Sequence, residues 1–185
     1  PVSDTMVRYG LGAIKGTGQG AIEEIVAARD GLGAHEGEGG GRFRSLFDFA
    51  ARVDRQRVNK RVVEALIKAG AFDALHPDRA TALASVGLAF EWADTQAANV
   101  LQGGLFDFGP DDKDGHASST QEPSLAHAEP WTLRERLMLE KAALGFYLSG
   151  HRFDESGAEV RRFARRRIAD LVDSRDVQLL AGIVT

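Results

Sequence analysis

The sequence predicts a mostly α-helical chain of short helices separated by glycine-rich turns. Apolar residues recur at three- and four-residue spacing through much of the chain. Two Ser/Thr-x-x-Asp/Glu patterns, at Ser45 and Thr132, have the form of helix-capping boxes. Glycines interrupt the apolar runs between residues 10 and 41. At 185 residues the chain is long enough for one domain or two small ones.

The first expected domain covers residues 1–75. Apolar residues on both sides of the first glycines predict two short helices, and Gly31–Gly41 is expected to be a loop. Further helices are predicted from Ser45 through Ala51 and over Val58–Ala69, the second of them ended by Gly70.

Beyond residue 75 the pattern changes three times. Residues 76–101 predict one longer helix with Asp78 as its N-cap. Residues 102–130 predict a flexible linker, because Gly, Asp, Ser and Pro replace the apolar periodicity. Residues 131–176 predict a helical connector, and the apolar, β-branched run 177–185 predicts a single strand.

Composition excludes several kinds of site. The chain has no cysteine, which rules out disulfides, thiolate-bound zinc and a cysteine nucleophile, and which suits a cytoplasmic protein. No apolar run approaches the roughly 20 residues of a membrane-spanning helix, so no membrane partner is expected. The start lacks an initiator methionine and a signal-peptide pattern, and the end stops within the predicted strand, so we expect a piece of a longer chain.

Charge is unevenly distributed along the chain. The net charge is −4, yet residues 42–68 carry eight Lys or Arg against three Asp or Glu, and residues 102–130 carry six acids against one Lys. The basic stretch keeps nucleic acid among the expected partners. Its candidate DNA-binding residues are Arg55, Arg57, Lys60 and Arg61, and the alternative is a solvated face without a ligand. For the five arginines within 161–167, domain packing is an equally good interpretation.

The opening glycines carry the most specific chemistry. A tight Gly-x-Gly turn between two short helices is typical of a helix–hairpin–helix, which directs backbone N–H groups and a helix N-terminus at a DNA phosphate. Glycine suits this turn because it tolerates positive φ and has no Cβ to hold the phosphate away. Such contacts grip the DNA backbone without reading its sequence. The predicted site residues are Lys15, Gly16, Thr17, Gly18, Gln19 and Gly20.

These glycines have two other possible interpretations. They could simply end one helix and start the next. A dinucleotide-binding Gly-x-Gly-x-x-Gly would need a preceding strand. The residues before Gly16 have helical spacing, so the dinucleotide interpretation is rejected.

Three separated blocks give the chain a family resemblance. They are "YGLGAIKG", "VNKRVVEALIKAGAFD" and "EKAALGFYLSGH", and in this order they resemble the alpha subunits of bacterial DNA polymerase III, which are C-family replicative polymerases. The resemblance covers essentially the whole chain. It implies a stretch from the distal fingers, with tandem helix–hairpin–helix elements, to the first strand of an OB-fold domain. The second hairpin would lie near Gly70, where no Gly-x-Gly follows, so its phosphate contact stays open.

The resemblance also implies a sliding-clamp motif in "QGGLFDF". Gln102, Leu105 and Phe106 match its glutamine, aliphatic and aromatic positions. Adjacent apolar side chains in an acidic linker are expected to be buried against a partner, since burying each side chain contributes about 1.5–3 kcal/mol. The alternative is that these side chains dock on their own domain.

For the parent protein, the resemblance implies a DNA-directed DNA polymerase that requires Mg²⁺. Its implied partners are double-stranded DNA, the sliding clamp (the beta subunit) and other replicase subunits. Two-metal polymerisation needs clustered carboxylates. The acids here are scattered and the histidines lack ligand spacing, so no catalytic or metal residue and no cofactor is assigned to this fragment. The expected role is duplex backbone binding with clamp tethering. The alternatives are a helical scaffold that contacts only protein and a helix–hairpin–helix repair protein.

Overall fold

The computed structural model describes residues 9–32, 40–106, 121–173 and 175–183. Within those ranges the chain is helices joined by turns and extended segments, with no residue in a β-strand, so the mostly helical fold class is confirmed. The elements in chain order are the 3-10 helix η1 (Leu11–Ala13), α1 (Gln19–Asp30), α2 (Leu46–Arg52), α3 (Lys60–Lys68), α4 (Arg79–Ala84), α5 (Val86–Phe106), α6 (Leu133–Leu144), α7 (Phe153–Val160) and the 3-10 helix η3 (Ile168–Asp170).

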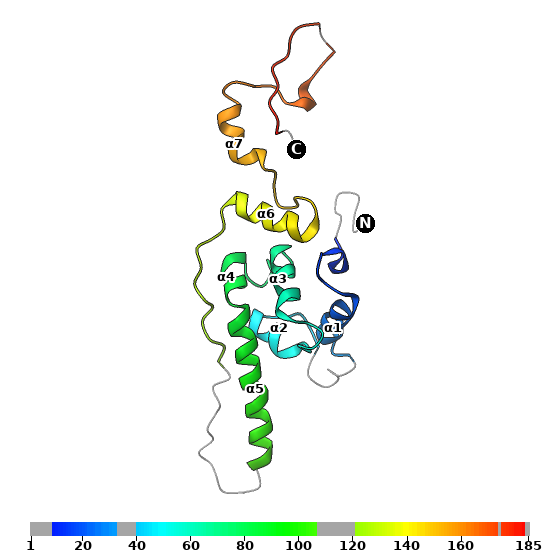
Figure 1. The fold of residues 1–185 in the computed structure, drawn as a ribbon, viewed down its shortest axis with the longest axis vertical. Coiled ribbons are helices and arrows are strands. Elements are labelled where there is room, and N and C mark those ends of the chain that lie inside the picture. The colour runs from blue at the N-terminus through cyan, green and yellow to red at the C-terminus, as the bar shows by residue number, and fades with distance from the viewer. Residues whose placement is uncertain (1–8, 33–39, 107–120, 174, 184–185) are drawn as a thin grey trace.

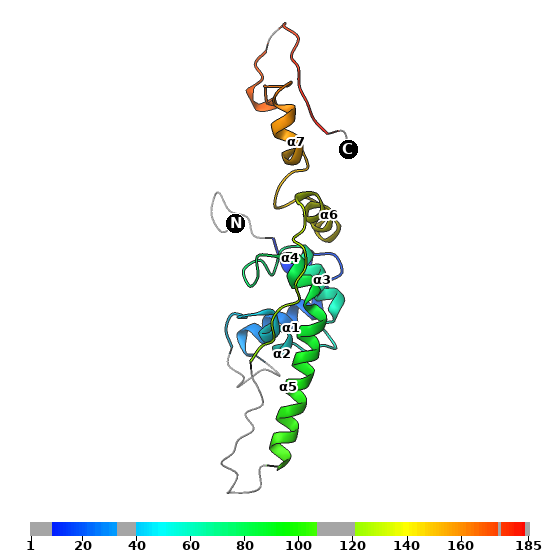
Figure 2. The same cartoon turned by 90° about the vertical axis from the view of Figure 1, so that its left-hand side faces the viewer.

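The helices form an elongated arrangement. α1 to α4 gather around the first turns of α5, and α5 then continues alone past the group (Figure 1). α6 crosses the opposite end of the group, above α3 and α4, and α7 lies further out on the same side. Figure 2, turned by 90°, shows the same order along the long axis.

Packing of α2 against α5 forms the centre of the core. Phe47 on α2 meets Trp92 on α5 edge-to-face, with 5.5 Å between ring centroids, and Phe49 meets Phe72 in the same way at 4.9 Å. Buried residues of α5 fall at positions 86, 89, 90 and 93, which is the spacing of one helical face. Val100 is 75% exposed, so the packed part of α5 ends before it.

Side-chain caps begin four of the helices, three of them at residues that the sequence indicates. Ser45 accepts a hydrogen bond from the N–H of Asp48 at 2.9 Å, and Asp78 accepts one from Ala80 at 3.0 Å. Asn59 caps α3 through Val62 at 3.2 Å. Thr132 and Glu135 form a complete capping box at the start of α6. The predicted caps at Ser45, Asp78 and Thr132 are therefore confirmed, and each satisfies a backbone donor that the helix leaves free.

The region predicted as one helix over 76–101 differs from the prediction. It is split at Ser85 into α4 and α5, and α5 continues to Phe106, five residues into the predicted linker. The Ser85 hydroxyl is buried, donates to the carbonyl of Thr81 at 2.7 Å and accepts from the N–H of Ala126 at 2.9 Å. A side chain that bonds the preceding turn in this way competes with regular helix geometry.

The last third of the predicted linker, residues 121–130, is an extended segment packed on the helices. Glu122 accepts from the Ser45 hydroxyl at 2.7 Å, Ala126 bonds Ser85, and Leu125 packs against the core. These contacts arise because residues far apart in sequence meet, which composition does not reveal. The predicted linker residues 107–120 lie outside the described part of the chain.

The strand predicted over 177–185 is not formed in residues 177–183. A strand requires a neighbour to take up its backbone N–H and C=O groups. The part of the chain that the structure describes supplies no such neighbour.

One buried ion-pair cluster joins α6 to the helices below it. Arg79, which is 7% exposed, donates to both carboxylate oxygens of Asp73 at 2.7 Å and to Glu140 on α6 at 3.2 Å. Glu140 is fully buried and also accepts from the N–H groups of Leu148 and Ser149 at 2.7 and 2.9 Å. Burial raises the pKa of Glu140, but these two N–H groups and Arg79 outweigh burial and hold the pKa below its ordinary value of 4.5.

Glu140→Gln is expected to lower the free energy of unfolding by about 2–3 kcal/mol at neutral pH, because it removes a charged acceptor shared by four donor groups. The folded-state pKa is depressed, so the wild-type advantage is present above pH 4.5 and shrinks as pH falls through that lower pKa. Urea unfolding of both chains across this range measures the difference. Glu159→Gln, at an exposed glutamate of α7, is the control. A Glu140→Gln difference that does not change with pH would contradict this account.

Candidate nucleic-acid interface

A tight turn connects η1 to α1. Gly16 has φ +85°, in the left-handed region that glycine adopts without strain. The Thr17 hydroxyl lies 2.7 Å from the carbonyl oxygen of Ile14 and 3.1 Å from that of Leu11, so this side chain closes the turn. Gly18 is the N-cap of α1, and the chain passes directly from turn to helix.

The N-terminus of α1 is open to solvent. No side chain caps it at Gly18, and Gly16, Gly18, Gln19 and Gly20 are exposed. The first N–H groups of a helix have no intrahelical acceptor and lie at the positive end of the helix dipole. The turn therefore presents backbone donors to an anion from outside.

Internal packing does not require glycine at positions 18 and 20. A Cβ built at either position would meet no protein atom within 4 Å. Gly18 has φ −76°, which any residue adopts. Gly20 lies within α1, where alanine is the more favourable residue. A side chain here would obstruct only a group that approaches the backbone from outside, as a phosphate does.

The hairpin rests on the end of α6. The N–H of Lys15 donates to the carbonyl of Ala143 at 2.8 Å, and Tyr9 meets Phe146 edge-to-face at 5.1 Å between centroids. The Lys15 side chain is exposed and extends past Gly145, where a Cβ would lie 3.6 Å from Nζ. Sequence reasoning missed this support, because some 130 residues separate the two segments and no local pattern marks the contact.

The second glycine turn is closed, in contrast to the first. Gly70 also has positive φ, +86°, but a Cβ there would lie 2.2 Å from the Arg79 guanidinium and 3.1 Å from Asp73. The protein's own cation therefore fills the space in front of this turn. A group that approached the Gly70 backbone from this side would have to displace Arg79.

The four basic candidates do not form one group with the hairpin. Arg55 pairs with Asp94 and donates to the carbonyl of Phe90 at 3.4 Å, so it holds the chain against α5. Lys60 reaches toward Gly87 at the start of α5, with Nζ 3.5 Å from where a Cβ would lie. Arg57 and Arg61 are exposed. The structure thus brings Lys15 to Gly20 together and directs Arg55 and Lys60 toward another helix.

Gln102, Leu105 and Phe106 lie in the last turns of α5 rather than in a linker. Helical residues three and four positions apart share a face. The spacing of 102, 105 and 106 therefore puts these positions on one side of the helix end.

Two other kinds of site are absent from the described residues. No helix among them is long and apolar enough to cross a membrane. They also contain no group of three or more histidine, aspartate or glutamate side chains that could hold a metal ion.

Comparison with known proteins supports the hairpin and identifies the relatives. A family model for the helix-hairpin-helix motif matches residues 2–82. DNA polymerase III subunit alpha of Neisseria meningitidis serogroup B is 44% identical over 185 residues, which is all of this chain and 15% of that protein. The chain is homologous to one segment of DNA polymerase III subunit alpha.

Two further subunits of this name give the same result. The DNA polymerase III subunit alpha of Pseudomonas aeruginosa is 40% identical and covers 98% of this chain and 16% of its own length. That of Escherichia coli K12 is 39% identical and covers 86% of this chain and 13% of its own length. The chain thus spans about one seventh of these relatives.

Alanine substitutions at two glycines of the hairpin are expected to change stability in opposite directions. Gly16→Ala should cost about 1 kcal/mol, because a Cβ is strained at positive φ. Gly20→Ala should stabilise by roughly 0.5 kcal/mol, because it favours the helix and meets no neighbour. Urea unfolding of each variant against the wild type measures both effects. Destabilisation by Gly20→Ala would mean that this glycine has a packing role.

Proposed function

We propose that this chain is a DNA-binding segment of a replicative DNA polymerase. It grips duplex DNA through backbone phosphates, with the turn Lys15–Gly20 as the principal contact. The main support for this proposal is the open N-terminus of α1. At Gly18 and Gly20 no contact within the protein would exclude a side chain. The helix-hairpin-helix match over residues 2–82 and the polymerase relatives support the same function.

The mode of contact follows from the donors present. Backbone N–H groups at a helix N-terminus bind phosphate oxygens and are blind to base identity. The ammonium group of Lys15 adds one mobile charge next to the turn, which strengthens binding and makes it depend on salt. Sequence-independent binding suits a polymerase, which must advance along any template.

The proposal extends to a protein partner and to the whole enzyme. Positions 102, 105 and 106, at the end of the projecting α5, would tether the chain to the sliding clamp. Two weak contacts in one chain raise each other's effective concentration, which would keep the polymerase on DNA. Nucleotide addition with Mg²⁺ in the cytoplasm, together with other replicase subunits, belongs to the proposed parent enzyme.

Gly20→Ala is expected to weaken binding to a fluorescent DNA duplex about tenfold, because the new methyl group holds the phosphate off the backbone. Since the same change favours the helix, the loss cannot come from unfolding. Lys15→Gln should reduce the slope of log K against log salt by about 0.9, the value for one phosphate contact. Fluorescence anisotropy across a salt series measures both effects.

Arg29→Gln is the matched control, since Arg29 is exposed at the far end of α1 and pairs with Asp30 at 2.7 Å. It should leave affinity and salt slope nearly unchanged. If wild-type binding does not depend on salt, or if all three variants bind alike, the scaffold interpretation replaces this one.

Leu105→Ala combined with Phe106→Ala is expected to weaken binding to the purified sliding clamp by at least tenfold. Each apolar side chain buried in a partner contributes about 1.5–3 kcal/mol. Calorimetric titration measures the loss. Val100→Ala is the control, because Val100 is exposed on the same helix just before the proposed motif. Equal binding by the double variant would place the clamp contact elsewhere.

A further inference from the structure

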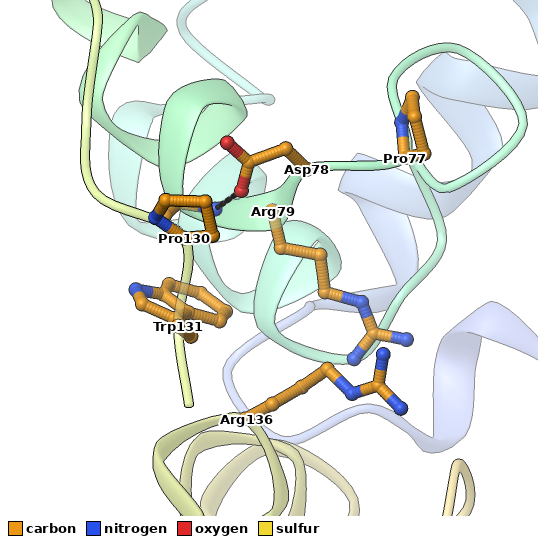
Figure 3. Close-up of a pocket in the computed structure, with 7 residues that line it drawn as sticks. Pro77, Asp78, Arg79, Pro130, Trp131 and Arg136 are labelled. Carbon is orange, nitrogen blue, oxygen red and sulfur yellow. Dashed lines mark hydrogen bonds between the residues drawn. The ribbon is translucent and has the colours of Figure 1, made fainter. Parts of the chain in front are cut away.

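A cavity lies where the start of α4, the end of the extended segment and α6 meet. Its volume is about 310 Å³, and its walls include Pro77, Asp78, Arg79, Pro130, Trp131 and Arg136. Figure 3 shows Pro130 and Trp131 on one side, with the guanidinium groups of Arg79 and Arg136 reaching toward the same region on the other. The cavity lies away from the hairpin turn, so nothing in the proposed DNA contact uses it.

The two arginines are unequally compensated. Arg79 has two carboxylate partners, Asp73 at 2.7 Å and Glu140 at 3.2 Å. Arg136 makes one long hydrogen bond, from Nη2 to the carbonyl oxygen of Ser149 at 3.5 Å, and forms no ion pair with any described residue. Arg136 is therefore the guanidinium group on this cavity that has no carboxylate partner among the described residues.

Arg136 also has a buried donor without an acceptor. Its Nε is the one buried side-chain nitrogen or oxygen in the described residues that lacks a hydrogen-bond partner. Leaving such a donor unpaired costs about 1–3 kcal/mol, more for a charged group. Buried unpaired donors are rare in native proteins and call for an explanation, such as a bound water or ion.

The residues that line the cavity indicate what kind of ligand could accept a hydrogen bond from Arg136. Trp131, Pro77 and Pro130 are apolar surface next to Arg136. The carboxylate of Asp78 is already engaged as the cap of α4 and as an acceptor from Thr81 at 2.7 Å. Its negative charge on the same cavity disfavours a doubly charged phosphate and is better tolerated by a singly charged ligand. An arginine beside an aromatic ring and prolines therefore suits a carboxylate attached to an apolar group.

We propose that this cavity binds a carboxylate carried next to an apolar side chain, as an extended peptide of a partner protein presents it. The carboxylate accepts from the Arg136 guanidinium and balances its charge. The apolar side chain packs on Trp131 between the two prolines. The carboxylate can come from a peptide C-terminus or from an acidic side chain.

Titration of the 185-residue chain with short peptides, followed by tryptophan fluorescence, tests this site. The probes are N-acetyl-leucyl-phenylalanine with a free carboxylate, its C-terminal amide, and N-acetyl-glutamyl-leucine amide, which carries the charge on a side chain. We expect the free acid to bind at least tenfold more tightly than its amide, and the third probe to show which source of carboxylate is preferred. Trp131→Phe should abolish the signal, because the other tryptophan, Trp92, packs on Phe47.

Arg136→Gln should weaken binding of the free acid at least tenfold, whereas Arg134→Gln, at an exposed arginine of the same helix, should leave it unchanged. Circular dichroism checks that both variants fold. The comparison of the free acid with its amide uses the wild-type chain and does not depend on the variants. Three results would overturn the proposal: equal binding of acid and amide, a response to inorganic phosphate in place of the peptides, or no response to any probe.

Discussion

The hydrogen bonds and ion pairs of the Arg79 guanidinium hold together the part of the molecule that contains α3, α4, α6 and the hairpin turn. This guanidinium connects three places at once: the turn after α3 through Asp73, the end of α3 through the carbonyl of Lys68 at 3.3 Å, and α6 through Glu140. Glu140 in turn fixes the backbone at Leu148 and Ser149. α6 then supplies the carbonyl of Ala143 that holds the hairpin turn at Lys15. A buried charge network of this kind tolerates little change, because each member that loses its partner is left desolvated and unpaired.

The same cation explains why two similar glycine turns have different surroundings. Both Gly16 and Gly70 have positive φ near +85°, so their backbones are alike in that respect. What differs is the occupant of the space in front of the turn: solvent at Gly16, and Arg79 at Gly70. At the second turn the N–H groups of Gly70, Ala71 and Asp73 are already bonded to backbone carbonyls, and Arg79 occupies the place that a Cβ would take, whereas nothing lies within 4 Å of that place at Gly16.

The sequence predicted the local features well and the tertiary ones poorly. Caps at Ser45, Asp78 and Thr132 could be predicted because capping depends on residues three positions apart. The Gly16 turn could be predicted because only glycine adopts its backbone freely. The break at Ser85 was not predicted, and the contact that Ser85 makes there with Ala126, some 40 residues away, leaves no local pattern in the sequence. Nor could the role of Arg55 be predicted, since it belongs by composition to a basic stretch but is held by Asp94 on α5. The support of the hairpin by α6 could not be predicted either, because it too joins residues far apart in the sequence.

The length of α5 has a consequence for how its far end is oriented. The helix has 21 residues, packs on the core through Ala93, and then continues to Phe106. In a flexible coil, loss of one residue would shorten the reach slightly and leave every orientation accessible. In a helix, the same deletion between Ala93 and Gln102 withdraws the end by about 1.5 Å and turns it by about 100° about the axis. The face presented at positions 102–106 is therefore determined by the exact count of residues in α5, so insertions and deletions in this arm act on direction far more than on distance.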